Sequence, residues 1–136
     1  MGKKKIFTAV YKSISGLIVT SLQRKRYVQI TPQQLFDLIG SGEKITIVDY
    51  RYEDDFKKGH IEGAINVPFT EFSRNIKSIP REYPVVSICY VGAVGKITAQ
   101  TLAKKGYSSS MNVYGGIKAW EKAKYPIFKP DNSVIG

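Results

Sequence analysis

Residues 85–106 read VVSICYVGAVGKITAQTLAKKG, and this stretch decides the fold class of the chain. Residues 85–89 are largely apolar, which is typical of a strand in a sheet that is buried on both faces. Residues 96–105 have a helical pattern, and Gly106 is placed to end that helix. The stretch therefore predicts a buried strand that runs through a short glycine-containing loop into a helix that starts near Lys96.

The same alternation of strand and helix extends over most of the chain. The predicted strands are residues 27–30, 45–49, 64–67, 85–89 and 111–114, and the predicted helices are residues 31–39, 52–58, 70–79, 96–105 and 117–124. Such alternation implies right-handed crossovers, so we expect an α/β fold with a central, mostly parallel five-stranded sheet and helices on both faces. A chain of 136 residues is long enough to bury one core of this kind.

The chain contains one cysteine, Cys89, and one histidine, His60. A single cysteine excludes an intramolecular disulfide, and one histidine beside it cannot complete a Cys-rich zinc site. We therefore expect neither a metal nor a cofactor. A lone free thiol fits a reducing compartment, which predicts a cytoplasmic location.

The net charge of +10 suggests nucleic-acid binding, but the distribution of the charge argues against it. Seven of the 21 basic residues lie before residue 27, whereas all 11 acidic residues follow it, so the remainder carries a net charge of only +3. The basic character therefore belongs to an N-terminal extension, and we expect no nucleic-acid partner.

The extension, residues 1–26, has apolar residues at helical spacing between Ile6 and Leu22. Three interpretations remain open: the helix packs on the domain or on a partner subunit, it lies on a membrane surface, or it is a signal sequence or anchor. Lys12 and Gly16 interrupt the apolar run, which disfavours a spanning helix. The alternative to a cytoplasmic location is therefore association with a membrane through residues 1–26.

Cys89 ends its predicted strand at the edge of the sheet where ligands bind in open α/β folds. A short loop before a helix presents free N–H groups, and these together with the helix dipole favour an anion. A sulfur atom held there is stabilised as the thiolate nucleophile. The alternative is a buried structural cysteine.

Four segments together resemble the rhodanese family: IVDYR at 47–51, GHIEGAINVP at 59–68, CYVG at 89–92 and NVYGGIKAW at 112–120. The resemblance covers residues 27–126, and we place the domain at residues 27–128, followed by a tail at 129–136. It implies a rhodanese-like fold and a sulfurtransferase that receives a sulfane sulfur from thiosulfate or a persulfide. A thiol or a protein then accepts this sulfur.

Cys89 matches the catalytic cysteine of the family, and the residues after it match the loop that cradles the persulfide. We therefore expect the donor to contact Tyr90, Val91, Gly92, Ala93, Val94, Gly95 and Lys96. Arg51 is a further candidate, which either faces the substrate or pairs with Asp49 to brace the loop. The motif around His60 resembles a structural turn of the family, so we expect Asp49 and His60 to be structural supports.

The loop departs from the family at its end, where many rhodaneses carry a charged or hydroxyl residue and this chain has Val94. The loop therefore lacks side chains that would donate hydrogen bonds to a small dianion, although Lys96, the residue that follows the loop, could supply a positive charge. The related cell-cycle phosphatases have an arginine where this chain has Gly95, so phosphatase activity is disfavoured. The alternative to an enzyme is a catalytically weak, rhodanese-like binding or regulatory module.

We predict that deletion of residues 1–26 leaves Cys89-dependent sulfur transfer nearly unchanged, because the extension lies outside the resemblance. Turnover of the truncated protein would be compared with that of the full chain, with folding checked by circular dichroism. Loss of turnover in a truncated protein that remains folded would show that the extension contributes to the site.

Overall fold

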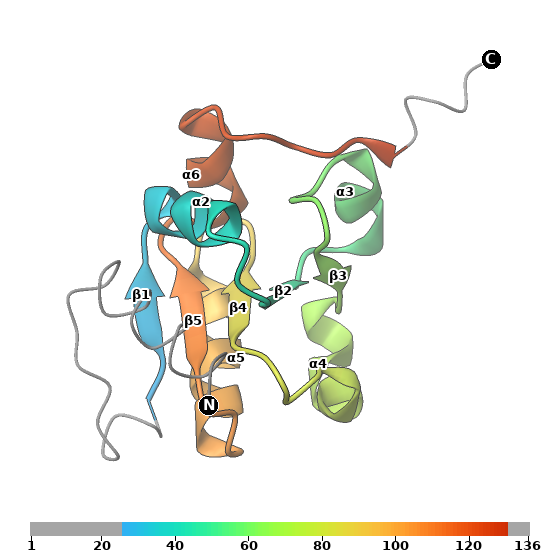
Figure 1. Cartoon of the computed structure of the whole chain (residues 1–136). Coiled ribbons are helices and arrows are strands. Elements are labelled where there is room, and N and C mark those ends of the chain that lie inside the picture. Colours follow the sequence, from blue (N-terminus) through green and yellow to red (C-terminus); the bar gives the residue numbers. More distant parts are fainter. Residues whose placement is uncertain (1–25, 131–136) are drawn as a thin grey trace.

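A computed structural model describes residues 26–130 and confirms the predicted five-stranded sheet. The strands are ordered β1-β5-β4-β2-β3, and all neighbouring strands are parallel (Figure 1). Their bounds are β1 Val28–Ile30, β2 Thr46–Asp49, β3 Ile65–Asn66, β4 Val85–Ile88 and β5 Ser110–Val113. Strand β4 lies in the middle of this order, so both of its edges are paired.

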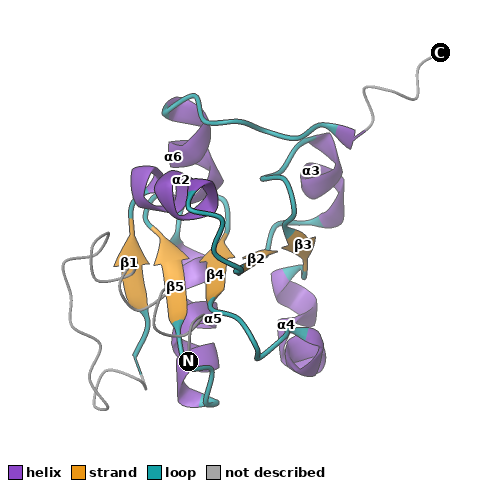
Figure 2. Ribbon diagram, viewed as in Figure 1, coloured by secondary structure: helices purple, strands orange, loops and turns teal. Residues whose placement is uncertain are grey.

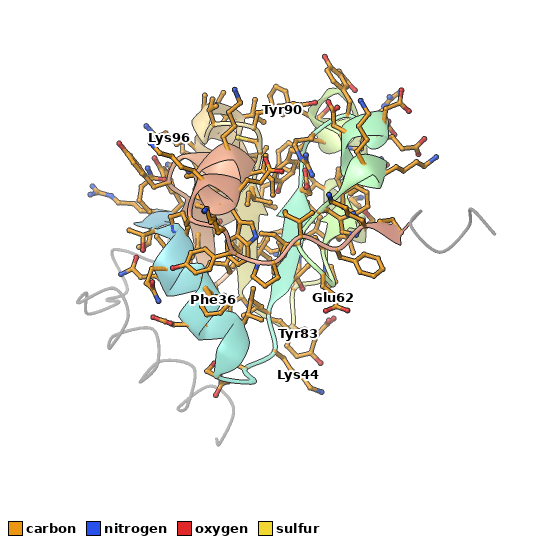
Figure 3. The ribbon with its side chains drawn as sticks, turned by 90° about the horizontal axis from the view of Figure 1, so that it is seen from above. Phe36, Lys44, Glu62, Tyr83, Tyr90 and Lys96 are labelled. Atoms are coloured by element: carbon orange, nitrogen blue, oxygen red, sulfur yellow. The ribbon has the colours of Figure 1, made fainter. Side chains whose placement is uncertain are left out.

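Helices cover both faces of the sheet, as expected (Figure 2). Helices α2 (Pro32–Gly40) and α6 (Gly116–Lys122) lie together on one face. Figure 3 shows the molecule with its side chains, seen from above. Helices α4 (Phe72–Asn75) and α5 (Ala93–Lys104) lie on the other face, and α3 (Glu53–Lys58) follows β2. Two short 3₁₀ helices, η2 (Phe69–Glu71) and η3 (Ile76–Ser78), flank α4.

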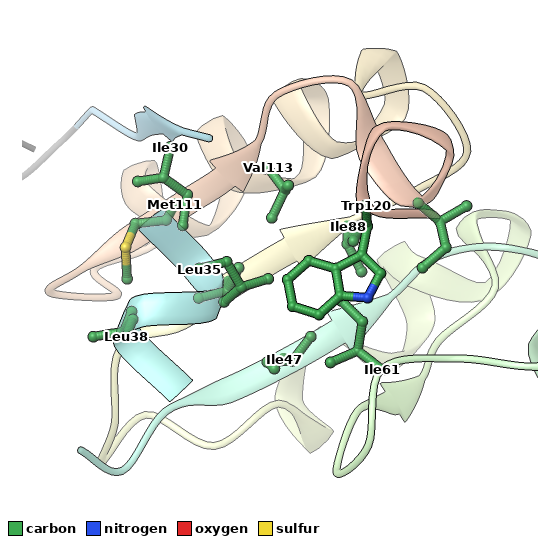
Figure 4. Close-up of a cluster of buried hydrophobic side chains, with 11 residues drawn as sticks. Ile30, Leu35, Leu38, Ile47, Ile61, Ile88, Met111, Val113 and Trp120 are labelled. Carbon is green, nitrogen blue, oxygen red and sulfur yellow. The ribbon is translucent and has the colours of Figure 1, made fainter. Parts of the chain in front are cut away.

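Alternate residues of β4 enter two hydrophobic cores. Val86 and Ile88 belong to the core under α2 and α6, where Leu35 and Trp120 are almost fully buried (Figure 4). Val85 belongs to the core under α4 and α5, and so does Cys89, which follows the strand directly. Because successive side chains of a strand point to opposite faces, the position of Cys89 in the chain decides which core its thiol joins.

The structure corrects the predicted start of the helix after Cys89. Helix α5 begins at Ala93 and not near Lys96, so Gly95 lies in its first turn. The prediction placed the helix after Gly95 because glycine is a poor helix former. In the structure a glycine is required at residue 95, because Asn112 approaches so closely that no side chain would fit.

Two other predicted elements also differ from the structure. The predicted helix at 70–79 is a series of three short segments, η2, α4 and η3, and the predicted strand at 64–67 contracts to Ile65–Asn66. Strand β3 lies at the edge of the sheet and pairs only with β2, which accounts for its short length.

Within residues 26–130, no helix combines the length and the apolar character needed to cross a membrane. The predicted amphipathic helix of the extension falls on residues 1–25, which lie outside the described residues, as do residues 131–136 of the predicted tail.

Candidate active site

Cys89 lies directly after β4, at the carboxyl edge of the sheet and between β5 and β2. Its side chain is 3% exposed, and its thiol is free. The thiol therefore lies at the edge where parallel sheets bind ligands, and it is largely shielded from water.

Two backbone N–H groups donate hydrogen bonds to Cys89 Sγ. The nitrogen of Gly92 lies 3.1 Å from the sulfur, and that of Gly95 lies 3.2 Å from it. Gly92 is the N-cap of α5 and Gly95 lies in the first turn, so both belong to the helix end where N–H groups have no acceptor within the helix. We call residues 90–95 the cradle loop. Its N–H groups and the helix dipole favour negative charge on the sulfur.

Gly92 makes the turn from the loop into α5. Its φ angle of 100° is a left-handed conformation that glycine adopts without strain, and its carbonyl accepts the N–H of Lys96. Ala93 is exposed at the start of the helix, whereas Val94 is half-buried and packs against the core that contains Cys89. The side chain of Val94 thus contributes to the packing of that core.

The N-terminus of α6 holds the other end of the cradle loop. The N–H groups of Ile117 and Lys118 donate to the carbonyls of Cys89 and Tyr90, at 2.7 and 3.1 Å. In a trans peptide the carbonyl and the N–H point in opposite directions. Turning these two carbonyls toward α6 therefore turns the N–H groups of Tyr90 and Val91 away from α6.

The side chain of Tyr90 anchors the start of the loop to α3. Its hydroxyl donates to Asp55 and accepts from the N–H of Tyr52. Burial, followed by the hydrogen bond to Asp55, raises the pKa of Tyr90 above its ordinary value. The hydroxyl therefore stays protonated at neutral pH and keeps its role as a donor to Asp55.

Arg51 and Asp49 form a buried ion pair on the same edge of the sheet. The guanidinium contacts both carboxylate oxygens, with Nη2 at 2.9 Å from Oδ2, and Nη2 also donates to the carbonyl of Gly59 at 2.7 Å. The Arg51 side chain lies over the Tyr90 ring, 5.9 Å from its centroid. These contacts favour the interpretation of Arg51 as a brace over that of an anion-binding residue.

The remaining predicted residues lie in different surroundings. His60 is buried against Phe56, with ring centroids 3.7 Å apart, and its Nδ1 lies 2.8 Å from the Phe56 carbonyl. Lys96 is exposed on the second turn of α5, and Val91 is 57% exposed on the loop. No cluster of three metal-binding side chains occurs within residues 26–130.

The sequence analysis did not single out four buried polar residues as candidates for the site: Tyr50, Ser87, Thr98 and Asn112. The Ser87 hydroxyl donates to that of Tyr50, and burial raises the pKa of Tyr50 to about 12. Thr98 donates to the carbonyl of Gly95 at 3.1 Å, and the amide of Asn112 contacts Gly92. The available signal was a polar residue inside each of two mostly apolar segments, Ser87 in residues 85–89 and Asn112 in residues 111–114.

We predict that Gly116→Ala destabilises the protein, because a Cβ at residue 116 would lie 2.4 Å from the carbonyl oxygen of Cys89. The φ angle of 62° adds strain for any residue with a side chain. We expect a loss of about 2–3 kcal/mol in the free energy of unfolding, measured with urea.

The matched control is Gly40→Ala, at the end of α2, where a Cβ would meet nothing within 4 Å. This change should be neutral or stabilise the protein by about 0.5 kcal/mol. Equal effects of the two substitutions would contradict the assigned contact between α6 and the cradle loop.

Comparison with known proteins identifies relatives of this chain. The chain matches the family model for the Rhodanese-like domain over residues 31–123. It is 31% identical over 101 residues to the thiosulfate sulfurtransferase GlpE of Actinobacillus pleuropneumoniae serotype 3 (strain JL03), covering 74% of this chain and 93% of that protein. It is 27% identical over 82 residues to the putative sulfur carrier protein YrkF of Bacillus subtilis (strain 168), covering 60% of this chain and 44% of that protein.

Solved structures agree with the sequence relatives. A rhodanese-related protein from Thermoplasma volcanium superimposes with a TM-score of 0.69 at 26% identity, covering 76% of this chain and 99% of that one. A rhodanese-like domain protein from Staphylococcus aureus gives a TM-score of 0.63 at 25% identity, covering 68% of this chain and 90% of that one. Because the family model matches more than half of the chain, this protein belongs to the rhodanese-like domain family.

Proposed function

We propose that this protein is a sulfurtransferase in which Cys89 carries a sulfane sulfur as a persulfide. The observation that carries the proposal is the pair of N–H groups, from Gly92 and Gly95, that point at Cys89 Sγ. Membership of the rhodanese-like family and the named activity of the GlpE relative support it.

In the first half-reaction, the Cys89 thiolate attacks the sulfane sulfur of the donor. A new S–S bond forms, the S–S bond of the donor breaks, and the leaving group departs with the bonding electron pair. With thiosulfate the leaving group is sulfite, and with an organic persulfide it is a thiolate. The outer sulfur of the new persulfide is anionic, and we assign its stabilisation to the N–H groups of the cradle loop.

In the second half-reaction, a thiol or protein acceptor attacks the outer sulfur as a nucleophile. The S–S bond of the persulfide breaks, and Cys89 leaves as the thiolate that the same N–H groups stabilise. One sulfur atom moves from donor to acceptor without net oxidation of the protein, so no cofactor is required. The lone thiol suits a reducing compartment, and we propose a cytoplasmic location.

The charges near the loop bear on the donor. The described contacts of the Arg51 guanidinium commit it to Asp49 and Gly59, and the cradle loop carries no charged side chain. We therefore propose that the loop binds the transferred sulfur chiefly by backbone groups. On this basis a persulfide donor is favoured over thiosulfate, whose dianionic charge would rely on Lys96.

A catalytically weak binding module is the second candidate function. The observations that favour it are the low exposure of the Cys89 side chain, 3%, and the apolar end of the loop at Val94. In this case the surface around the cradle loop would bind a partner, and Cys89 would not take up sulfur.

We predict that incubation with thiosulfate or an organic persulfide adds one sulfur atom to the intact protein, measured by mass spectrometry. Cys89→Ser should remain unmodified, because residue 89 is the only thiol in the chain. Subsequent addition of a thiol should restore the original mass. A wild-type protein that gains no sulfur from any donor would favour the binding module.

We also predict that Cys89 reacts with iodoacetamide at a lower pH than a free thiol does, because two N–H groups stabilise its anion. The midpoint of the alkylation rate against pH should lie clearly below about 8.5. The signal is unambiguous since no second cysteine competes. A midpoint at or above that of a free thiol would rule out the proposed role of the N–H groups.

A further inference from the structure

We propose that Asn112 is a positioning residue for the cradle loop, which holds both glycines whose N–H groups bind Cys89 Sγ. This inference rests on the proposed function, because it assigns the geometry of the nucleophile to a residue outside the loop. Asn112 acts through Gly92 and Gly95 and has no described contact with the sulfur.

Asn112 lies on β5, next to the strand that leads to Cys89. It pairs in register with Ser87 of β4, and its side chain is 0% exposed. Two residues earlier on β5, the hydroxyl of Ser110 donates to the carbonyl of Ala99 in α5. Residues 110 and 112 point to the same face of the sheet, so both contact α5, Ser110 at its middle and Asn112 at its first turn.

The first contact of Asn112 is with Gly92. Its Nδ2 lies 3.3 Å from the Gly92 carbonyl oxygen, which also accepts the N–H of Lys96 at 3.1 Å. The same Nδ2 donates to the side-chain carbonyl of Gln29, its neighbour in register on β1. Because both Nδ2 hydrogens have acceptors, the amide is held in one orientation, and it fixes the N-cap of α5.

The second contact is with Gly95. A Cβ built at residue 95 would lie 1.9 Å from Asn112 Oδ1 and 3.6 Å from Cys89 Sγ. Gly95 therefore lies between the amide oxygen of Asn112 and the sulfur of Cys89. Within residues 26–130, Asn112 Oδ1 is the one buried side-chain polar atom without a hydrogen-bond partner.

An unpaired buried oxygen is costly, and an apolar residue of similar size would avoid that cost. The amide nevertheless has a definite role, because its nitrogen supplies the hydrogen bond to Gly92 while its oxygen packs against Gly95. Loss of Asn112 would free both glycines to move. The N–H···S distances would then lengthen, and the thiolate and the persulfide would lose stabilisation.

The test compares the pH profile of Cys89 alkylation in four forms of the full chain: wild type, Asn112→Leu, Asn112→Asp and Ser110→Ala. Asn112→Leu keeps the branched shape and the number of side-chain heavy atoms but removes the amide. Asn112→Asp replaces the donor to Gly92 with an acceptor and adds negative charge near the sulfur. Ser110→Ala is the matched control, because it removes a buried hydrogen bond between the same strand and the same helix, away from the cradle loop.

We expect the alkylation midpoint of Asn112→Leu to move up by roughly 0.5–1 pH unit, and that of Asn112→Asp to move further in the same direction. The midpoint of Ser110→Ala should equal that of wild type even where its melting temperature falls. The initial rate of sulfur loading at pH 7 should fall about three- to tenfold in Asn112→Leu, in line with the loss of thiolate.

An unchanged midpoint in Asn112→Leu, with a melting temperature lowered as in Ser110→Ala, would overturn the inference and leave Asn112 a purely structural residue. If Asn112→Leu does not fold, Gln29→Leu supplies the same test, because it removes the half-buried partner that orients the amide. Its midpoint should move up by a smaller amount, and an unchanged midpoint there would equally refute the proposal.

These outcomes separate the inference from the proposed function. Sulfur loading of the wild-type protein tests the function, whereas the difference in midpoint between variants tests Asn112. A wild-type protein that takes up no sulfur, together with a raised midpoint in Asn112→Leu, would refute the transfer activity but retain Asn112 as the residue that positions the loop.

Discussion

The close packing of α5 against β5 at Gly95 is the constraint on which the rest of the site depends. Without a Cβ at residue 95, the first turn of the helix lies directly against the amide of Asn112. This approach brings the N–H of Gly95 within 3.2 Å of Cys89 Sγ, while Gly92 supplies the second donor. The donors belong to the backbone, so their geometry is set by the packing of whole elements.

The cradle loop has no charged side chain, and the charged residues Asp49, Arg51 and Asp55 beside it are engaged in other contacts. Asp49 and Arg51 neutralise each other in a buried pair, and Tyr90 donates to Asp55. Meanwhile the N-terminus of α6 is engaged by the carbonyls of Cys89 and Tyr90. The described hydrogen bonds of the thiol consequently come from backbone N–H groups at the start of α5 and not from charged side chains.

The sequence analysis succeeded where a property is local. Alternating segments predicted the five parallel strands, and the apolar run ending at Cys89 predicted a thiol at the carboxyl edge. It failed at the start of α5, because Gly95 is read as a helix breaker when its neighbours in space are unknown. It also overlooked Asn112, whose partner Gln29 is 83 residues away in the chain.

The sequence by itself thus determined the order of elements, the fold class and the position of the one thiol in the chain, since periodicity, glycine placement and residue type are local properties of the sequence. Only the tertiary structure decided which N–H groups face the sulfur, whether Arg51 is paired, and which side chain lies against Gly92 and Gly95. The physical reason is that Gly92, Gly95, Asn112 and Ile117 acquire their roles through contacts between β4, β5, α5 and α6, and such contacts exist only once the sheet has formed.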